Sequence, residues 1–206
     1  MPVKKHNFSA GPSILPDYTF ERCSQAVLEL DEMGLSLLEI SHRSEEFVSI
    51  LNQTKGLIKE LLNVPSSHEI LFIQGGASMQ FCMIPYNLLS VNGKCGFVDT
   101  GTWSSKAIKE AKIFGETQVI ASSEDKKYTY VPKEYQIPKD LDFLHITTNN
   151  TIYGTQLKDV PKSDVTLIAD MSSDIFSKAI DVSKFCLLYT SPSPRDGATS
   201  RMPSSA

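Results

Sequence analysis

Apolar residues recur with two different periods along this chain, and the change from one period to the other divides the sequence. In the first third, apolar positions three and four residues apart predict two amphipathic helices, at residues 16–33 and 44–62. The first is expected to end at Gly34, and the second is expected to begin with Ser44 as its N-cap. Between them, residues 37–40 are predicted to form a short extended piece.

Short apolar runs alternate with helical patterns in the rest of the chain. The expected strands are residues 69–73, 94–99, 117–121, 143–148 and 165–169, and the expected helices are residues 78–89 and 104–114. Near-continuous apolar strands separated by helices are typical of a mostly parallel sheet that is covered on both faces. The sequence therefore predicts an α/β fold of three layers, α/β/α, with helices on either side of one sheet.

Composition narrows the classes of function that this chain can have. Its 206 residues are 41% hydrophobic and 21% charged, which is enough to bury the core of a globular protein. A formal net charge of −4 argues against a nucleic-acid-binding protein, which would carry a basic face. The four cysteines have no C-x-x-C spacing, so reduced thiols are favoured over disulfides or a metal site. Because the chain has neither an apolar leader nor an apolar run that could span a membrane, we expect a cytoplasmic protein.

Ligands of parallel sheets lie beyond the carboxyl ends of the strands, so the residues that follow each predicted strand are the candidate site. Gln74, Gly75, Gly76, Ala77 and Ser78 come between the strand at 69–73 and the next helix. Backbone N–H groups at such a helix start can hold an anion, most naturally a phosphate. A tight turn without a ligand is the alternative that Gly-Gly also allows.

Three further strand ends carry side chains that suit a ligand. The only tryptophan, Trp103, follows the strand at 94–99 and can either stack on a planar ligand or pack as a core aromatic. Residues 149–154 offer short polar side chains that are either turn formers or ligand donors. Asp170 ends the apolar run 165–169, where a buried carboxylate is usually retained for a cationic partner. A planar, phosphorylated ligand with a cationic nitrogen matches all four strand ends.

Six motifs occur in the order and spacing of one enzyme family. They are Phe8-Ser9-Ala10-Gly11-Pro12, Ser41-His42-Arg43, Gln74-Gly75-Gly76-Ala77-Ser78-Met79-Gln80-Phe81, Thr100-Gly101-Thr102-Trp103-Ser104, Asn150-Thr151-Ile152-Tyr153-Gly154 and Ala169-Asp170-Met171-Ser172-Ser173. On these motifs the chain, from about residue 6 to 185, resembles the phosphoserine aminotransferases. The resemblance implies the type I fold of pyridoxal 5'-phosphate enzymes, a homodimer and small-molecule substrates. It implies amino transfer between glutamate and the phosphorylated 2-oxo acid 3-phosphohydroxypyruvate in serine biosynthesis, and a phosphohydroxythreonine step in pyridoxine synthesis.

The resemblance also implies roles for individual residues. Gly76, Ala77 and Ser78 would hold the cofactor phosphate, although many members of the family have an arginine in place of Ser78. Trp103 would stack on the pyridine ring, Thr151 would donate to its 3-oxygen, and Asp170 would pair with its protonated nitrogen. Arg43 would bind the substrate carboxylate, a role that suits a planar bidentate donor. A surface ion pair with Glu45 or Glu46 is the alternative for Arg43, and we assign no chemistry to His42.

The resemblance ends where the family places its catalytic lysine. In the family an Ala-Gly-Ala-Gln-Lys motif supplies the lysine that forms the Schiff base with the cofactor, and this lysine would fall near Pro194. The sequence has no lysine after Lys184, so we assign no catalytic residue and expect this chain to be inactive by itself. Lys178 and Lys184 are poor substitutes because they precede the last strand.

The expected domain organisation follows from the same comparison of motifs. Residues 1–15 are predicted to be an N-terminal arm, and residues 16–188 a partial cofactor-binding large domain. Residues 189–206, rich in Ser, Pro, Arg, Thr and Gly, are predicted to be a disordered tail unrelated to the family, and the small C-terminal domain is predicted to be absent.

Two alternatives remain open at this point. One is another pyridoxal-phosphate enzyme of the same fold, such as a cysteine desulfurase or an alanine–glyoxylate type aminotransferase. The other is a non-catalytic domain that binds a phosphorylated small molecule or a partner subunit. Ser41-His42-Arg43 and Thr102-Trp103-Ser104 favour the phosphoserine aminotransferases over the first alternative.

Overall fold

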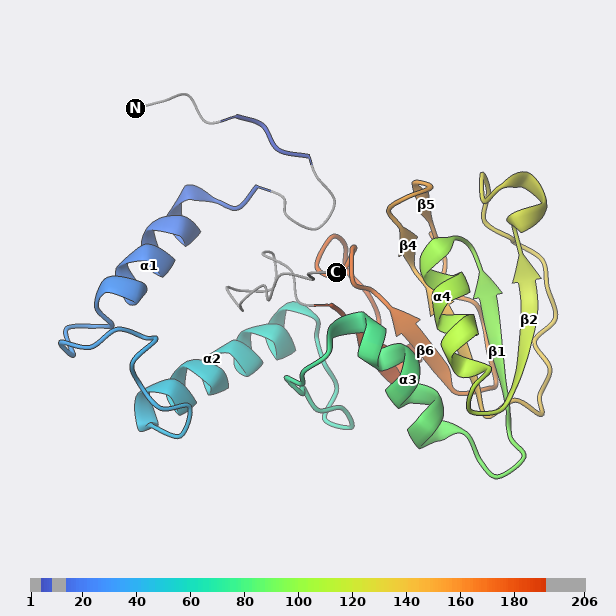
Figure 1. Ribbon diagram of the computed structural model, residues 1–206, viewed down its shortest axis with the longest axis horizontal. Helices are drawn as coiled ribbons and strands as arrows, with labels where there is room; N and C mark the ends of the chain where they lie inside the picture. Colours follow the sequence, from blue (N-terminus) through green and yellow to red (C-terminus); the bar gives the residue numbers. More distant parts are fainter. Residues whose placement is uncertain (1–4, 9–13, 192–206) are drawn as a thin grey trace. The chain divides into compact units, whose positions relative to one another are not determined.

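A computed structural model describes residues 5–8 and 14–191 of the chain (Figure 1). The chain divides into two compact units, one containing Met1–Val64 and the other formed by Pro65–Ser191. The division lies inside the stretch 16–188 that we expected to be one domain. Within the predicted tail, Tyr189 still belongs to a strand, and residues 192–206 lie outside the described part of the chain.

The first unit contains the two helices that the apolar spacing predicts. Helix α1 spans Asp17–Leu28, and it ends earlier than expected because Glu29 is already extended. Helix α2 spans Glu45–Leu61, and the Ser44 hydroxyl accepts a hydrogen bond from the Phe47 N–H at 3.3 Å, which confirms the N-cap. Neither helix buries a residue. Among the helices in the described residues, none has both the length and the apolar content needed to cross a membrane.

The link between these helices is a turn, so the prediction of an extended piece at residues 37–40 was wrong. The Ser36 hydroxyl accepts a hydrogen bond from the Leu38 N–H at 3.1 Å, and the Ser36 carbonyl accepts one from the Glu39 N–H at 2.9 Å. A serine that bonds to the backbone two residues ahead favours a turn over an extended chain.

The second unit is a five-stranded parallel sheet with helices packed on it, which confirms the predicted α/β class. The strand order is β2-β1-β3-β6-β7, and every neighbouring pair is parallel. The strands of this sheet are β1 (Lys94–Asp99), β2 (Glu116–Ser122), β3 (Phe143–Thr147), β6 (Leu167–Asp170) and β7 (Leu187–Tyr189). The helices are α3 (Gly76–Leu88) and α4 (Thr102–Ala111), with 3-10 turns η1 (Glu124–Lys126) and η2 (Val182–Lys184). A small antiparallel ribbon joins β4 (Asn149–Asn150) to β5 (Thr155–Gln156).

Alternating side chains of the strands build two cores, one on each face of the sheet. Helices α3 and α4 lie over one face of the sheet (Figure 1). On this face, Phe97 and Phe143 belong to a core with Phe81 of α3 and Ile108 of α4. On the other face, buried strand residues such as Leu144 pack against connecting segments that include residues 131–137 and 175–180. Within the described residues, this second face is therefore covered by loops, where the pattern led us to expect helices.

The apolar run at residues 69–73 does not form the predicted strand. The residue just before it, His68, is hydrogen-bonded through Nε2 to the carbonyl oxygen of Phe185 at 2.7 Å, and Ala77, just after it, packs on the core beneath α3 and α4. Within the described part of the chain, residues 69–73 pair with no strand. Leu71, at 73% exposure, accordingly faces solvent. A strand exists only where a neighbouring strand pairs with its backbone, and none of the described strands pairs with this run.

Candidate functional site

The parallel sheet brings three of the predicted site residues to one edge. Register pairs Thr147 of β3 with Asp170 of β6, so these strands end at the same level, and β1 ends at the same edge with Asp99. Trp103 and Thr151 follow these ends, and the Trp103 Nε1–H donates to Thr151 Oγ1 at 3.3 Å. Tryptophan and threonine are 48 positions apart in sequence, so this contact is made by the topology.

Buried Asp99 fixes the turn that carries Trp103. Its Oδ1 accepts hydrogen bonds from the hydroxyls of Ser104 at 2.8 Å and Ser105 at 3.0 Å, and its Oδ2 accepts one from Tyr128 at 3.0 Å. Ser104 Oγ in turn accepts from the backbone N–H groups of Thr100 and Gly101. The first turn of α4, and with it Trp103, is thus anchored to the end of β1.

Asn150 positions the neighbouring strand end against this turn. Its Nδ2 donates to Thr100 Oγ1 at 2.8 Å, and a Cβ on Gly101 would lie 2.6 Å from its Oδ1. Only glycine fits this close approach. Asn150 is 1% exposed, and its Oδ1 has no hydrogen-bond partner among the described residues.

The start of α3 has the geometry expected of an anion cradle. Gly75 and Gly76 have φ values of +95° and +57°, and a Cβ on Gly75 would lie 2.3 Å from that of Met79. No side chain caps the helix and its first turn holds no acidic residue, so its first N–H groups can serve a ligand. Ala77 packs on the core and Ser78 is exposed.

Asp170 is a carboxylate that is buried among neutral hydrogen-bond donors. It is 4% exposed, and its Oδ1 accepts from the N–H of Ser172 at 3.0 Å and from the Ser172 hydroxyl at 2.6 Å. Ser172 Oγ also accepts from the Ser191 N–H at 3.0 Å. Burial raises the pKa of Asp170, and the hydrogen bonds from Ser172 oppose that rise. Among the described residues, no lysine or arginine forms an ion pair with Asp170.

Two buried residues at this edge were missed by sequence reasoning. His145 of β3 is 2% exposed, and its Nε2 lies 2.9 Å from the hydroxyl of Tyr189, the last residue of β7. Burial lowers the pKa of His145 to about 3, so the imidazole is neutral. A histidine in the middle of the apolar run Phe143-Leu144-His145-Ile146 is the signal that could have revealed it.

Arg43 and the two late lysines lie elsewhere in the chain. Arg43 belongs to the first unit and is exposed, and among the described residues it has no ion pair with Glu45 or Glu46. Lys184 pairs with Asp181 at 3.7 Å, and Lys178 Nζ donates to the carbonyl oxygen of Leu157 at 3.4 Å. Both lysines lie in the segment that joins β6 to β7, and each is held by a group away from Asp170.

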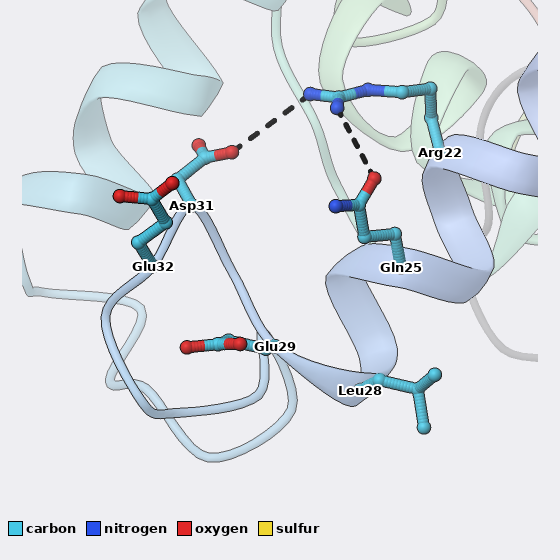
Figure 2. A pocket seen from close by; sticks show the side chains of 6 residues that line it. All are labelled: Arg22, Gln25, Leu28, Glu29, Asp31 and Glu32. Carbon is cyan, nitrogen blue, oxygen red and sulfur yellow. Dashed lines mark hydrogen bonds and ion pairs between the residues drawn. The ribbon is translucent and has the colours of Figure 1, made fainter.

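A surface pocket of about 550 Å³ in the first unit does not include any of these residues. Figure 2 shows its lining, which comes from the end of α1 and the turn after it. Arg22 lies 3.9 Å from Asp31 and 3.4 Å from Gln25 Oε1, with Glu29 and Glu32 nearby. Arg22 is the one cation in this lining, and Asp31 and Gln25 already hold it. Because three carboxylates also line the pocket, it does not suit a phosphorylated ligand.

Comparison with known proteins decides the family. Residues 5–192 match the family described as aminotransferase class-V. The chain belongs to this family. It is 59% identical to the phosphoserine aminotransferase of Parabacteroides distasonis and 54% identical to that of Flavobacterium johnsoniae, covering 91% of this chain in each case. The alignments cover 52% and 53% of those proteins, so the chain spans about half the length of the class-V aminotransferases that it matches.

Solved class-V aminotransferases have the same fold. The phosphoserine aminotransferase of Bacillus circulans superposes with a TM-score of 0.87 at 42% identity, covering 91% of this chain and 53% of that one. A phosphoserine aminotransferase of Trichomonas vaginalis, described as PLP-bound, superposes with a TM-score of 0.82 at 32% identity, covering 89% of this chain and 56% of that one. These matches confirm the pyridoxal-phosphate transferase fold that the resemblance implied.

Proposed function

We propose that this chain carries the cofactor-binding part of a phosphoserine aminotransferase. The enzyme would bind pyridoxal 5'-phosphate and move an amino group between glutamate and 3-phosphohydroxypyruvate. The single observation that carries the proposal is the shared edge of the sheet, where Trp103 contacts Thr151 at the level of buried Asp170. Identity of 51–59% to curated phosphoserine aminotransferases supports it further.

The residues at this edge fit the cofactor chemically. The uncapped start of α3, with Gly76, Ala77 and Ser78, suits its phosphate group. Trp103 offers a ring face, and Asp170 offers an acceptor that has no cationic partner among the residues the structure describes. Thr147 Oγ1 and Asn150 Oδ1 are buried at the same edge without partners among the described residues, as expected where a polar ligand is bound. When bound, the cofactor supplies an electron sink for breaking bonds at the amino-bearing carbon.

Each residue has a physical task in this proposal. Asp170 holds the proton on the ring nitrogen, because a buried anion without a counter-ion stabilises a cation placed next to it. Trp103 covers one ring face, and Thr151 orients the ring through its hydroxyl. Arg43 binds the substrate carboxylate through two parallel N–H donors.

The 206-residue chain lacks the lysine that would serve as the base of the proton-transfer step. Since no lysine follows Lys184, we expect the 206-residue chain to hold the cofactor without a covalent bond and to be inactive by itself. The missing lysine favours a second candidate function for the 206-residue chain, namely a domain that only binds the phosphorylated ligand. We also propose that the full-length enzyme is a cytoplasmic homodimer, which sedimentation of the full-length protein can test.

Titration with pyridoxal 5'-phosphate, followed by quenching of Trp103 fluorescence, tests the proposal. We expect saturable binding that weakens at least about tenfold in Asp170→Ala, because the ring nitrogen loses its counter-ion. Asp142→Ala is the matched control: its carboxylate holds Ser90 at the opposite end of the sheet, and its cofactor affinity should be unchanged. Equal affinity in wild type and Asp170→Ala would contradict the proposed site. Borohydride reduction that labels a lysine would contradict non-covalent binding.

A further inference from the structure

Asp170 is the end of a chain of three buried polar side chains, one from each of three neighbouring strands. Tyr189 of β7 is in register with Asp170 of β6, close enough for its hydroxyl to interact with the carboxylate, and the same hydroxyl lies 2.9 Å from Nε2 of His145 of β3. All three side chains lie on the face that α3 and α4 cover. Phe81 of α3 lies edge-on to Tyr189, with ring centroids 6.4 Å apart, and the Phe97 ring lies 5.0 Å from that of His145.

The chemistry of the three groups fixes the direction of every hydrogen bond. A carboxylate only accepts, so the Tyr189 hydroxyl donates to Asp170. The Tyr189 oxygen then accepts from His145, whose proton must be on Nε2. A neutral imidazole with its proton on Nε2 has a bare Nδ1, and Nδ1 is the His145 atom that has no partner among the described residues. The unpaired atom of His145 is thus an acceptor, and the N–H donor of His145 has a partner.

These donor and acceptor roles do not change across physiological pH. Burial and the charge of Asp170 raise the pKa of Tyr189 well above its ordinary value, so its hydroxyl remains a donor. His145 is neutral because burial lowers its pKa. Tyr189 and His145 therefore bring no positive charge to Asp170, which leaves the counter-charge to a ligand.

We infer that Tyr189, held by His145, is a positioning residue that fixes the orientation of the Asp170 carboxylate and lets it keep its negative charge while buried. This inference rests on the proposed function, in which Asp170 faces the ring nitrogen of the cofactor. Ser172 satisfies Oδ1 of Asp170, and Asp174, another buried carboxylate nearby, disfavours its charge. Tyr189 supplies the further donor that offsets this repulsion.

The first arm of the test needs no cofactor. Carboxyl-carbon NMR of the 206-residue chain, labelled at aspartate, follows the titration of Asp170, whose signal is identified by its loss in Asp170→Asn. We expect Tyr189→Phe to raise the Asp170 pKa by about one unit, since a hydrogen bond to the charged form is lost. His145→Leu should raise it by less. Tyr135→Phe, a half-buried tyrosine on the other face, is the matched control and should not change it.

The second arm separates positioning from a merely structural role. Its probes are pyridoxal 5'-phosphate and the 1-deaza analogue, which has the same phosphate and aldehyde but no basic ring nitrogen. We expect Tyr189→Phe to weaken binding of pyridoxal 5'-phosphate about tenfold and to leave affinity for the deaza analogue unchanged. Equal losses for both ligands would overturn the inference, because they would report a damaged fold.

Failure of the inference and failure of the proposed function give different results. An unshifted Asp170 pKa in Tyr189→Phe overturns the inference even if Asp170→Asn weakens cofactor binding. If Asp170→Asn leaves cofactor affinity unchanged, the proposed function fails, and with it the role of Tyr189 toward the cofactor. Trp103 fluorescence checks that each variant is folded. If Tyr189→Phe does not fold, His145→Leu is used, and an unshifted Asp170 pKa in that variant overturns the inference.

Discussion

Asp99 shows how one buried side chain can position a functional residue that it does not touch. Removing its carboxylate in Asp99→Ala would leave the Ser104, Ser105 and Tyr128 hydroxyls without their shared acceptor. The Ser104 and Ser105 hydroxyls can still donate to the Gly101 carbonyl oxygen, at 2.8 and 2.9 Å, so we expect the free energy of unfolding to fall by about 1–2 kcal/mol. Urea unfolding followed by Trp103 fluorescence measures this loss. Asp125→Ala, which removes one exposed hydrogen bond to Tyr130, should change it by less than about 0.5 kcal/mol.

His145 predicts a specific loss of stability in acid. Its pKa is 6.5 in an exposed state and about 3 when folded, so between these values the unfolded chain binds a proton that the folded chain does not. The free energy of unfolding must therefore fall as the pH falls through this window, by up to about 1.4 kcal/mol per pH unit. Asp170 acts in the opposite sense: its raised pKa gives stability that is present below pH 3.8 and lost as the pH rises.

Comparing the stability of two variants separates the pH dependence due to His145 from that due to Asp170. From pH 6 to pH 5, wild type should lose about 1 kcal/mol more stability than His145→Gln, which has no titrating group but can still donate to Tyr189. Urea unfolding at each pH, with Trp103 as the probe, measures the difference. His42→Gln, at an exposed histidine, should keep the wild-type dependence on pH. Parallel curves for wild type and His145→Gln would mean that His145 is not buried and neutral.

At the scale of elements, one substitution at the start of α3 should change helix stability and phosphate binding in opposite directions. A glutamate at position 78 places a negative charge in the first turn, where it favours the helix by about 0.3–1 kcal/mol. The same charge repels a phosphate held by that turn. We therefore expect Ser78→Glu to leave the urea midpoint unchanged or higher and to weaken pyridoxal 5'-phosphate binding about tenfold. Pyridoxal, which lacks the phosphate, is the control ligand, and an equal loss of its affinity would contradict a phosphate cradle at α3.

The elements also show what the sequence could and could not predict. The run at residues 94–99 was predicted as a strand and is one, β1, because neighbours pair with it on both sides. The run at 69–73 was also predicted from its apolar residues, but it forms no strand in the described structure, because an apolar pattern cannot report which segments pair. Strand β7 is three residues long, too short for any periodicity to identify it.

The part of the candidate site that depends only on parallel topology could be predicted from the sequence, and the part that depends on strand order could not. Parallel strands separated by helices must end at one edge, so Trp103, Thr151 and Asp170 could be grouped from sequence before any contact was known. The chain His145–Tyr189–Asp170 could not, since it depends on the order in which β3, β6 and β7 pair. Local sequence carries no record of that order. Residues 143–148 did contain the one signal, a histidine in a buried strand.

At the scale of the whole molecule, the described chain exposes apolar surface that a complete class-V aminotransferase would be expected to cover. In the sheet unit, Leu71, Phe72 and Ile73 are 73%, 53% and 52% exposed, and β7 is an edge strand that pairs only with β6. An exposed apolar run and an unpaired strand edge are each a site for pairing between copies of a chain.

We therefore expect the 206-residue chain to self-associate at concentrations on the order of tens of micromolar, with this segment as the contact. Phe72→Lys should reduce the association, because a charge on the exposed run cannot be buried between two copies without a partner. Sedimentation velocity over a range of concentrations measures the association. Val91→Lys is the matched control: Val91 is 93% exposed but lies alone in the turn after α3, so its substitution should have no effect. Equal behaviour of the two variants would show that the association is general hydrophobic aggregation, with no role for the exposed segment at residues 71–73.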